Sequence, residues 1–297
     1  MGYECAGGWT KHAASPVLGG ELGTVFDTCV LRGAGEYRMY CSWRDQKSIA
    51  LSRSADGVAW SRPVICLPFD CDSDWQHQVN RPVVVRTGGA WHMWYTGQAG
   101  GRSWIGHAVS DDGVAWHRAG ARPVLTAELP WEGVAVMCPH VLYDEDDAVF
   151  KMWYSAGEQY EPDAIGYATS ADGATWTKHA DNAVFAADAT SAWERAKVTA
   201  CQVIRRSDDY LMFYIGFRDV HYAQIGMARS ADGVAGWERY GGNPIIRPGA
   251  GWDASAVYKP YAVRDDDHDR WLLYYNGRRE HHEQIGIAVH EGFDLQF

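Results

Sequence analysis

The sequence predicts an all-β fold, a five-bladed β-propeller with four antiparallel strands in each blade. Three observations predict it: a turn motif that recurs at a near-constant interval, a strand-like aromatic segment before each copy, and an N-terminal segment that supplies the part missing from the last copy. The chain has 15 Trp, 16 Tyr and 32 Gly residues, a composition that suits short strands joined by tight turns.

The turn motif is SADGVAW at residues 54–60. Related copies begin at Ser110, Ser170 and Ser230, so successive starts lie 56, 60 and 60 residues apart. Asp-Gly is typical of a tight turn, here between the third and fourth strands of a blade. We expect these motifs to be structural, with the Trp of each one packing back on its own blade.

Two further segments repeat before each turn motif. An Ile-Gly pair occurs four times, and Ile49-Ala50 is a weaker first copy; the pairs begin at Ile105, Ile165, Ile225 and Ile285. Before these pairs lie five aromatic segments, at residues 37–43, 91–97, 150–157, 210–216 and 271–277. Alternating apolar residues, turn residues at each boundary and the absence of a 3.6-residue period favour strands over helices.

The last copy stops before its fourth strand, and the N-terminus carries a matching piece. Residues 8–12 and 16–18 (GWTKH and PVL) resemble residues 175–179 and 183–185 (TWTKH and AVF). We therefore expect residues 8–18 to complete the fifth blade and residues 1–297 to form a single domain. Closure of this kind leaves no free sheet edge.

Charge and composition exclude several classes of partner. The 38 acidic residues exceed the 27 basic ones, for a net charge of −11, which disfavours binding to nucleic acid or to an anionic membrane surface. No apolar run is long enough for a membrane helix, and residues 1–8 lack a signal-peptide pattern, so we expect a cytoplasmic protein. Seven scattered cysteines without a CxxC pair favour reduced thiols over disulfides. The oligomeric state is not indicated.

The starts of the five innermost strands are the first candidates for chemistry, because in a propeller they face a funnel on the central axis. They align at Asp27, Arg81, Cys138, Ala200 and Lys259. Strand alternation places the residues two positions further on the same face, at Cys29, Val83, His140, Gln202 and Tyr261. This axis is polar where a core would be apolar. It predicts either a binding site or a water-filled channel with an internal ion-pair network.

The loops after the second strands should reach the same funnel. They carry a dense set of donors and rings: Arg102, Trp104, Tyr160, Arg218, Asp219, His221, Arg278, Arg279, His281 and His282. The candidates for substrate binding are Trp104, Arg218, His221 and Arg278 from these loops and Arg81, Cys138, His140, Tyr258 and Lys259 from the innermost strands. Aromatic faces beside hydrogen-bonding side chains suit a sugar or another small molecule.

The SxDGxxW turns and WYxG strands resemble those of the five-bladed propellers of glycoside hydrolase families 43, 32, 62, 68 and 130. The resemblance covers the whole chain and implies catalysis by carboxylates at the starts of innermost strands. Asp27 matches the first-blade carboxylate. The other carboxylates of family 43 would fall on Cys138 and near Ala200, and those of family 32 on Arg81 and Met137.

Three alternatives supply the missing chemistry. Glu132, Glu194 and Asp253 each follow a Trp shortly before an innermost strand, and Glu132 or Glu194 is the candidate acid. Family 130 implies a second route, in which basic residues hold inorganic phosphate as the nucleophile beside Asp27. A third route abandons glycoside cleavage and uses Cys138 with His140 as a thiolate or acid–base centre.

The sequence thus predicts a carbohydrate-active enzyme that cleaves or transfers a glycosyl group on a small or glycosylated substrate, with Asp27 and the funnel residues. The alternatives are a propeller repurposed for another reaction in small-molecule biosynthesis and a non-catalytic sugar-binding propeller. No cofactor is expected. A calcium ion or a water on the axis, near Asp27, Cys29 and His140, is the lesser alternative.

Overall fold

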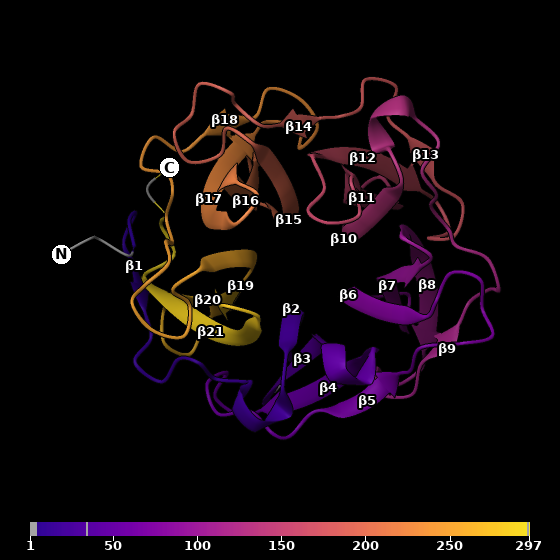
Figure 1. Cartoon of the computed structure of the whole chain (residues 1–297), viewed down its shortest axis with the longest axis horizontal. Coiled ribbons are helices and arrows are strands. Elements are labelled where there is room, and N and C mark those ends of the chain that lie inside the picture. Colours follow the sequence, from indigo (N-terminus) through magenta and orange to yellow (C-terminus); the bar gives the residue numbers. More distant parts are fainter. Residues whose placement is uncertain (1–4, 34, 296) are drawn as a thin grey trace.

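The computed structural model describes residues 5–33, 35–295 and 297, and their strands form antiparallel units around a common axis (Figure 1). Unit one contains β2 (Val25–Gly33), β3 (Glu36–Trp43), β4 (Ser48–Ser54) and β5 (Val64–Leu67). Unit two contains β6 (Gln78–Thr87), β7 (Ala90–Ala99), β8 (Arg102–Ser110) and β9 (His117–Arg118). Unit three contains β10 (Ala135–Asp144), β11 (Val149–Gly157), β12 (Ala164–Ser170), β13 (Thr177–Lys178) and β14 (Phe185–Ala186).

Unit four contains β15 (Lys197–Arg205), β16 (Tyr210–Asp219), β17 (Tyr222–Ser230) and β18 (Glu238–Arg239). Unit five contains β19 (Ala256–Asp265), β20 (Arg270–Arg279), β21 (His282–Glu291) and the N-terminal β1 (Trp9–Lys11). Units two and three share one nine-stranded sheet, because a single parallel pair, Ala135 with Ser103, joins β10 to β8. The helices among the described residues are three short 3-10 turns: η1 (Gly20–Leu22), η2 (Arg44–Gln46) and η3 (Pro130–Glu132). None of the described helices has the length and apolar character needed to cross a membrane.

The N-terminal segment pairs with the last unit. Trp9 lies opposite His290 on β21, and Leu18 forms a bridge with Ile285, so residues from both ends of this segment contact the same strand. The Trp9 ring also contacts Phe213 of unit four at 5.9 Å between centroids. The N-terminal β1 and the last strand, β21, therefore belong to one sheet (Figure 1).

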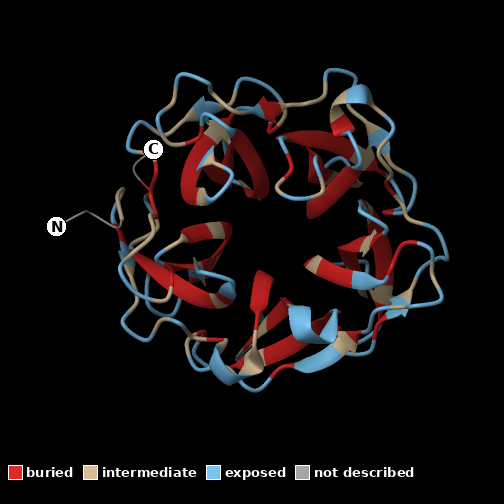
Figure 2. Ribbon diagram, in the orientation of Figure 1, coloured by how far each residue is buried: buried red, intermediate tan, exposed pale blue. Residues whose placement is uncertain are grey.

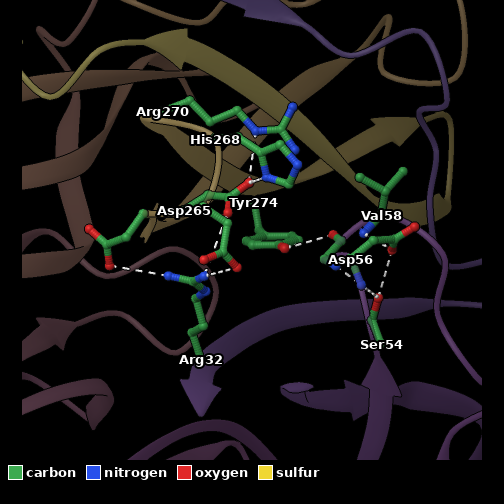
Figure 3. Close-up of polar contacts among 11 residues, drawn as sticks. Arg32, Ser54, Asp56, Val58, Asp265, His268, Arg270 and Tyr274 are labelled. Atoms are coloured by element: carbon green, nitrogen blue, oxygen red, sulfur yellow. Dashed lines mark hydrogen bonds and ion pairs between the residues drawn. The ribbon is translucent and has the colours of Figure 1, made fainter. Parts of the chain in front are cut away.

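The hydrogen bonds of the turn motif account for its repeated Ser, Asp and Gly residues. In the first copy, the Ser54 hydroxyl donates to Asp56, and Asp56 Oδ1 accepts from the backbone N–H groups of Val58 and Ala59 at 2.8 Å (Figure 3). Gly57 follows with a φ of 75°, in the left-handed region that favours glycine. The same bonds recur in the other three copies, which makes each turn self-contained.

Each turn is also clasped by the unit before it in the ring. The carbonyl of each motif glycine accepts a hydrogen bond from an aromatic side chain on the second strand of that unit; the donors are Tyr274, Tyr40, Trp94 and Trp153, to Gly57, Gly113, Gly173 and Gly233. The motif Trp residues behave similarly: Trp60 contacts Tyr274, and Trp116 contacts Tyr40. The expectation that each Trp packs on its own blade is therefore wrong, because its partner ring lies on the neighbouring unit.

A second repeated network explains the Trp-acid pairs. In unit three, buried Glu132 accepts from the Tyr154 hydroxyl at 2.7 Å and from Lys178 Nζ at 2.7 Å. Equivalent trios occur in three other units: Gln76 with Tyr95 and Arg118, Glu194 with Tyr214 and Arg239, and Asp253 with Tyr275 and Lys11. Lys11 comes from the N-terminal β1, so the network of unit five depends on closure of the ring.

The Trp of each pair explains the glycines of the aromatic and Ile-Gly segments. A Cβ on Gly97 would lie 2.4 Å from the Trp75 ring, and one on Gly106 would lie 2.6 Å from it. Trp193 covers Gly216 and Gly226, and Trp252 covers Gly277 and Gly286, in the same way. In unit three, Trp131 covers Gly166, whereas a Cβ on Gly157 would meet Asp163 instead. Buried residues accordingly dominate the inner strands of every unit, while the outermost strands and the peripheral connections are largely exposed or partly buried (Figure 2).

Candidate functional site

The five innermost strands share one backbone irregularity. Asp27, Arg81, Cys138, Ala200 and Lys259 all have positive φ, between 41° and 56°, and the register with the second strand shifts at each of them. Non-glycine residues in this region cost about 1 kcal/mol or more each, and such strain is characteristic of functional sites. The sequence alignment of the strand starts therefore identified five positions with the same unusual conformation.

Each of these five irregular positions is a β-bulge. Side chains from the neighbouring unit stabilise four of the five bulges. Each of the four backbone N–H groups donates to a hydroxyl or amide oxygen; the pairs are Asp27 to Asn276, Arg81 to Ser42, Cys138 to Thr96 and Ala200 to Ser155. The equivalent position in unit four is Ile215, whose side chain has no acceptor. Backbone geometry is thus repeated around the axis, while the side chains at the five positions differ in charge and size.

A cavity of about 470 Å³ opens at this end of the axis. It is lined by several of the predicted residues, namely Asp27, Arg81, Cys138, Tyr160, Tyr258, Arg278 and His281. It is also lined by Arg44, Glu161 and Glu283, which sequence reasoning did not single out. We refer to this cavity as the funnel.

Asp27 is held firmly in the funnel. Its Oδ1 accepts from Asn276 Nδ2 at 2.5 Å, and its Oδ2 lies 3.0 Å from Arg81 Nε. The Arg81 guanidinium also lies over the Phe26 ring, 5.6 Å from its centroid, and donates to Asn80 Oδ1. Both carboxylate oxygens therefore have fixed donors, which orients the Asp27 side chain in the funnel.

Glu161 is a second carboxyl group in the funnel. It lies on the loop between β11 and β12, with a φ of 60°. Burial raises the pKa of Glu161; the Arg81 charge opposes this, and the nearby Asp27 carboxylate adds to it. The pKa is therefore raised in the direction that favours a protonated acid.

Lys197 positions the loop that carries Glu161. Its Nζ lies 2.8 Å from Glu158 Oε2, 3.0 Å from Asp163 Oδ1 and 2.8 Å from the Glu161 carbonyl oxygen. The other two acidic residues of the loop are thus engaged by Lys197, while the Glu161 side chain faces the cavity. Small residues at Cys138 and Ala200 line the same cavity, at the positions where the family resemblance expects carboxylates.

Two further acidic residues line the funnel, the exposed Glu280 and the buried Glu283. Glu283 accepts from the Tyr258 hydroxyl at 2.5 Å and pairs with Arg44 Nη2 at 2.5 Å. Arg278 lies over the Tyr258 ring at 5.9 Å and donates to the carbonyl of His221. These contacts satisfy Glu283 within the protein and distinguish it from Glu161.

The structure does not bring the two predicted acids, Glu132 and Glu194, to the funnel. Glu132 accepts from two backbone N–H groups besides Tyr154 and Lys178, and Arg239 binds Glu194. Neither residue lines the funnel, and turning either one inward would leave a partly buried cation without this partner.

Other predicted residues lie apart from the funnel lining. Trp104 lines a separate hollow beside Trp75, and Arg218 pairs with Asp219 at 3.0 Å. His221 touches the site only through its carbonyl, and Lys259 is buried outside the lining.

The geometry disfavours a Cys138–His140 centre. Cys138 lines the funnel, whereas His140 lines a different cavity, and its Nε2 lies 2.8 Å from the Val203 carbonyl oxygen. Burial raises the pKa of Cys138 to about 11, with Arg81 and Lys259 only partly opposing it, and burial lowers the pKa of His140 to about 3. A neutral thiol and a neutral imidazole are expected at pH 7. Within the described part of the chain, no group of three or more His, Cys, Asp or Glu side chains is arranged to hold a metal ion.

Sequence comparison finds relatives of unknown role. No protein-family model matches the chain. Two uncharacterized proteins of Mycobacterium tuberculosis, Rv1502 and MT1551, are 28% and 27% identical to it over 192 and 224 residues. The match covers 55% of this chain and 59% of Rv1502, and 70% of both this chain and MT1551.

Solved structures with the same fold are glycoside-active propellers. A complex of BT0996 with RGII has a TM-score of 0.77 and 20% identity, covering 92% of this chain and 89% of that one. A thermostable family-43 glycoside hydrolase has a TM-score of 0.72 at 18% identity, covering 89% and 88%. A β-1,2-mannobiose phosphorylase from Listeria innocua has a TM-score of 0.73 at 12% identity, covering 95% and 96%. The chain therefore has the all-β fold of propeller-type glycoside hydrolases.

Proposed function

We propose that this protein is a carbohydrate-active enzyme that cleaves or transfers a glycosyl group in the funnel. We further propose that the five antiparallel units are the blades of a single propeller domain spanning residues 1–297. The observation that carries the functional proposal is the pair of unlike carboxyl groups, Asp27 and Glu161, in one polar cavity.

The two carboxyl groups suit the two roles that glycoside cleavage requires. Asp27 is oriented by Asn276 and Arg81, so it acts as nucleophile or as the base that activates the acceptor. Glu161, whose pKa burial raises, protonates the glycosidic oxygen of the leaving group. Glu161 thus replaces, from a loop, the acid that Cys138 and Ala200 do not supply.

The rest of the funnel fits a sugar. Tyr160 lies at the mouth with 64% of its surface exposed, which leaves a ring face for the apolar side of a pyranose or furanose. Gln78, Gln98 and His281 offer donors and acceptors for hydroxyl groups. The volume of about 470 Å³ corresponds to a small glycoside or the end of an oligosaccharide.

The test is a product screen with purified protein on aryl glycosides and short oligosaccharides, with and without inorganic phosphate. For any substrate that is turned over, Asp27→Asn and Glu161→Gln should each lower kcat by about 10²- to 10⁴-fold, the usual contribution of an acid–base group. Asp111→Asn, an exposed carboxylate on a turn, is the matched control and should keep full activity. Dependence on phosphate would assign phosphorolysis rather than hydrolysis.

Two results would contradict the proposal. Full activity in Asp27→Asn would remove this residue from the chemistry. Saturable binding of a sugar by the folded wild type, without any product, would instead support the sugar-binding alternative.

The Glu161→Gln variant has an additional readout, because an aryl glycoside with a good leaving group needs little protonation. Glu161→Gln should therefore retain more activity on such a substrate than on one with a poor leaving group.

A further inference from the structure

A second cavity, of about 690 Å³, opens at the opposite end of the innermost strands. A layer of buried side chains separates it from the funnel; the layer consists of Cys29, Val83, His140, Gln202 and Tyr261. This layer is interlocked, because the Cys29 thiol contacts the Tyr261 hydroxyl at 3.2 Å and the Gln202 amide bonds both the N–H and the carbonyl of Ala262. The predicted second row of axial residues thus closes the axis, and a ligand of one cavity does not reach the other.

The wall of the second cavity is aliphatic. Leu31, Val85, Leu142 and Ile204 each lie four residues after a bulge residue, line the cavity and are only partly buried. Side chains four apart on a strand share a face, so these residues form an apolar collar around the axis. Aliphatic groups that line a large cavity favour an occupant with an apolar body.

One side of the cavity mouth carries excess positive charge. Arg86 lies over the Trp91 ring at 5.3 Å, and no ion pair joins it to a carboxylate of the described residues. Arg38 lies over the same ring at 5.1 Å and shares its carboxylate, Glu36, with Arg53. Three guanidinium groups therefore face one carboxylate in this part of the structure.

The other charges at this end are neutralised. Arg32 is surrounded by Asp265, Asp266 and Asp267, and Asp265 is bound in addition by Arg270 and His268 (Figure 3). Lys151 and Arg205 share the buried Asp144, and each also contacts an exposed aspartate. The capacity to bind an anion is thus concentrated beside Trp91.

We propose that the second cavity is a binding site for an organic anion with an apolar body, whose carboxylate, sulfonate or phosphate group contacts Arg86 and Arg38 while the body contacts the collar. A guanidinium that lies over an aromatic face and lacks an acidic partner is a strong receptor for such groups. The proposal is independent of the reaction in the funnel, because the interlocked layer separates the two cavities.

The test uses the full chain and anilinonaphthalene sulfonate, a fluorescent anion with an apolar body. We expect saturable binding at one site per chain, and displacement by decyl phosphate and by decanoate, which distinguishes the two head groups. Arg86→Glu should weaken binding by about tenfold or more, since it replaces attraction by repulsion. Phenylnaphthylamine, which has a similar body without the charge, should bind about tenfold more weakly than the anion and should be insensitive to Arg86→Glu.

Matched controls separate this site from general surface binding. Arg62→Glu makes the same charge change at an exposed position outside both cavities and should leave affinity unchanged. Leu142→Gln, which alters only the collar, should weaken both probes, and Asp27→Asn should weaken neither. Equal losses in Arg62→Glu and Arg86→Glu, several non-saturating sites, or no binding to the folded wild type would each overturn the proposal.

Discussion

Two buried or partly buried glutamates, Glu132 and Glu161, differ in every physical respect that bears on function. Glu132 is fully buried and receives four donors, from two backbone N–H groups, Tyr154 and Lys178. Burial alone would raise its pKa, but these donors lower it below the ordinary value. Glu161 lies at the cavity wall and no donor of the described residues is bonded to its carboxyl, so burial raises its pKa.

The difference separates structural from chemical carboxylates. The partners of Glu132 recur in three other units at equivalent positions, which is expected for a network that holds each unit together. The surroundings of Glu161 occur once, and they combine a carboxylate, Asp27, with a guanidinium, Arg81. Repetition in this fold marks side chains that hold units together, as it does for Glu132 in four of the five units, and Glu161 departs from that repetition.

The largest effect on stability is expected from Glu132→Gln. The substitution leaves the Lys178 side chain, which is 10% exposed, beside a neutral amide, and loss of one member of a buried pair costs about 3–5 kcal/mol. Chemical denaturation measures this loss. Glu128→Gln is the matched control, because Glu128 lies 3.5 Å from the same lysine but is 67% exposed, and it should cost less than about 1 kcal/mol. Equal effects of the two variants would contradict a structural role specific to Glu132.

Glu161→Gln should have a smaller effect of opposite sign. A carboxyl whose pKa is higher in the folded than in the unfolded protein binds more protons in the folded state, so it lowers stability as the pH rises past its unfolded pKa. Replacing it by a neutral amide should raise the melting temperature at pH 7, and the gain should vanish at a pH below the ordinary range for glutamate. For Glu132 the linkage is reversed, because its lowered pKa adds stability above the unfolded pKa, which is lost as the pH falls.

The pH dependence of kcat should also distinguish Glu161 from Glu132. If Glu161 is the acid, kcat should fall on the alkaline side as the residue loses its proton, and this limb should disappear in Glu161→Gln, whereas Glu132→Gln should keep the wild-type profile in the molecules that remain folded. A pH–rate profile under conditions where each variant is folded by circular dichroism measures this. An unchanged alkaline limb in Glu161→Gln would assign the acid to another group.

The sequence predicted those features that depend on repeated residue types. The turn motif and the Ile-Gly pair recur because each encodes a local requirement: a positive φ at Gly57, or space for the Trp75 ring at Gly106. The N-terminal segment resembles the residues that follow the turn of unit three. This repeated residue pattern predicted that the segment joins the last unit, where Trp9 pairs with β21. Alignment of the innermost strands likewise located the five bulges.

The proposed acid, Glu161, was not predicted, because its place depends on the path of a single loop. Three acidic residues occur between β11 and β12, and only the contacts of Lys197 with Glu158 and Asp163 show that Glu161 is the one directed to the funnel. The Trp-acid pairs misled for a related reason. Their spacing placed Glu132 near an innermost strand, but the basic partner that fixes it, Lys178, follows 46 residues later on an outer strand.

The smallest effect on stability is expected from the hydrogen bonds that join the turn of one unit to an aromatic side chain of the unit before it. Tyr274→Phe removes only the hydroxyl that donates to the Gly57 carbonyl at 2.7 Å, and should cost about 1–2 kcal/mol for a buried acceptor left unpaired (Figure 3). In unit four the equivalent residue is Phe213. The unit that follows it, unit five, has no Asp-Gly turn to accept a hydrogen bond, and Trp9 packs on the Phe213 ring instead. Phe213→Tyr is therefore the matched opposite change, and it should also destabilise, since its hydroxyl would enter an apolar contact. Neither cost should vary between pH 5 and pH 8, because no group with a pKa in that range takes part. Any change of stability with pH would then come from the glutamates. A gain in stability from Phe213→Tyr would show that a clasp does not need the turn that it holds elsewhere in the ring.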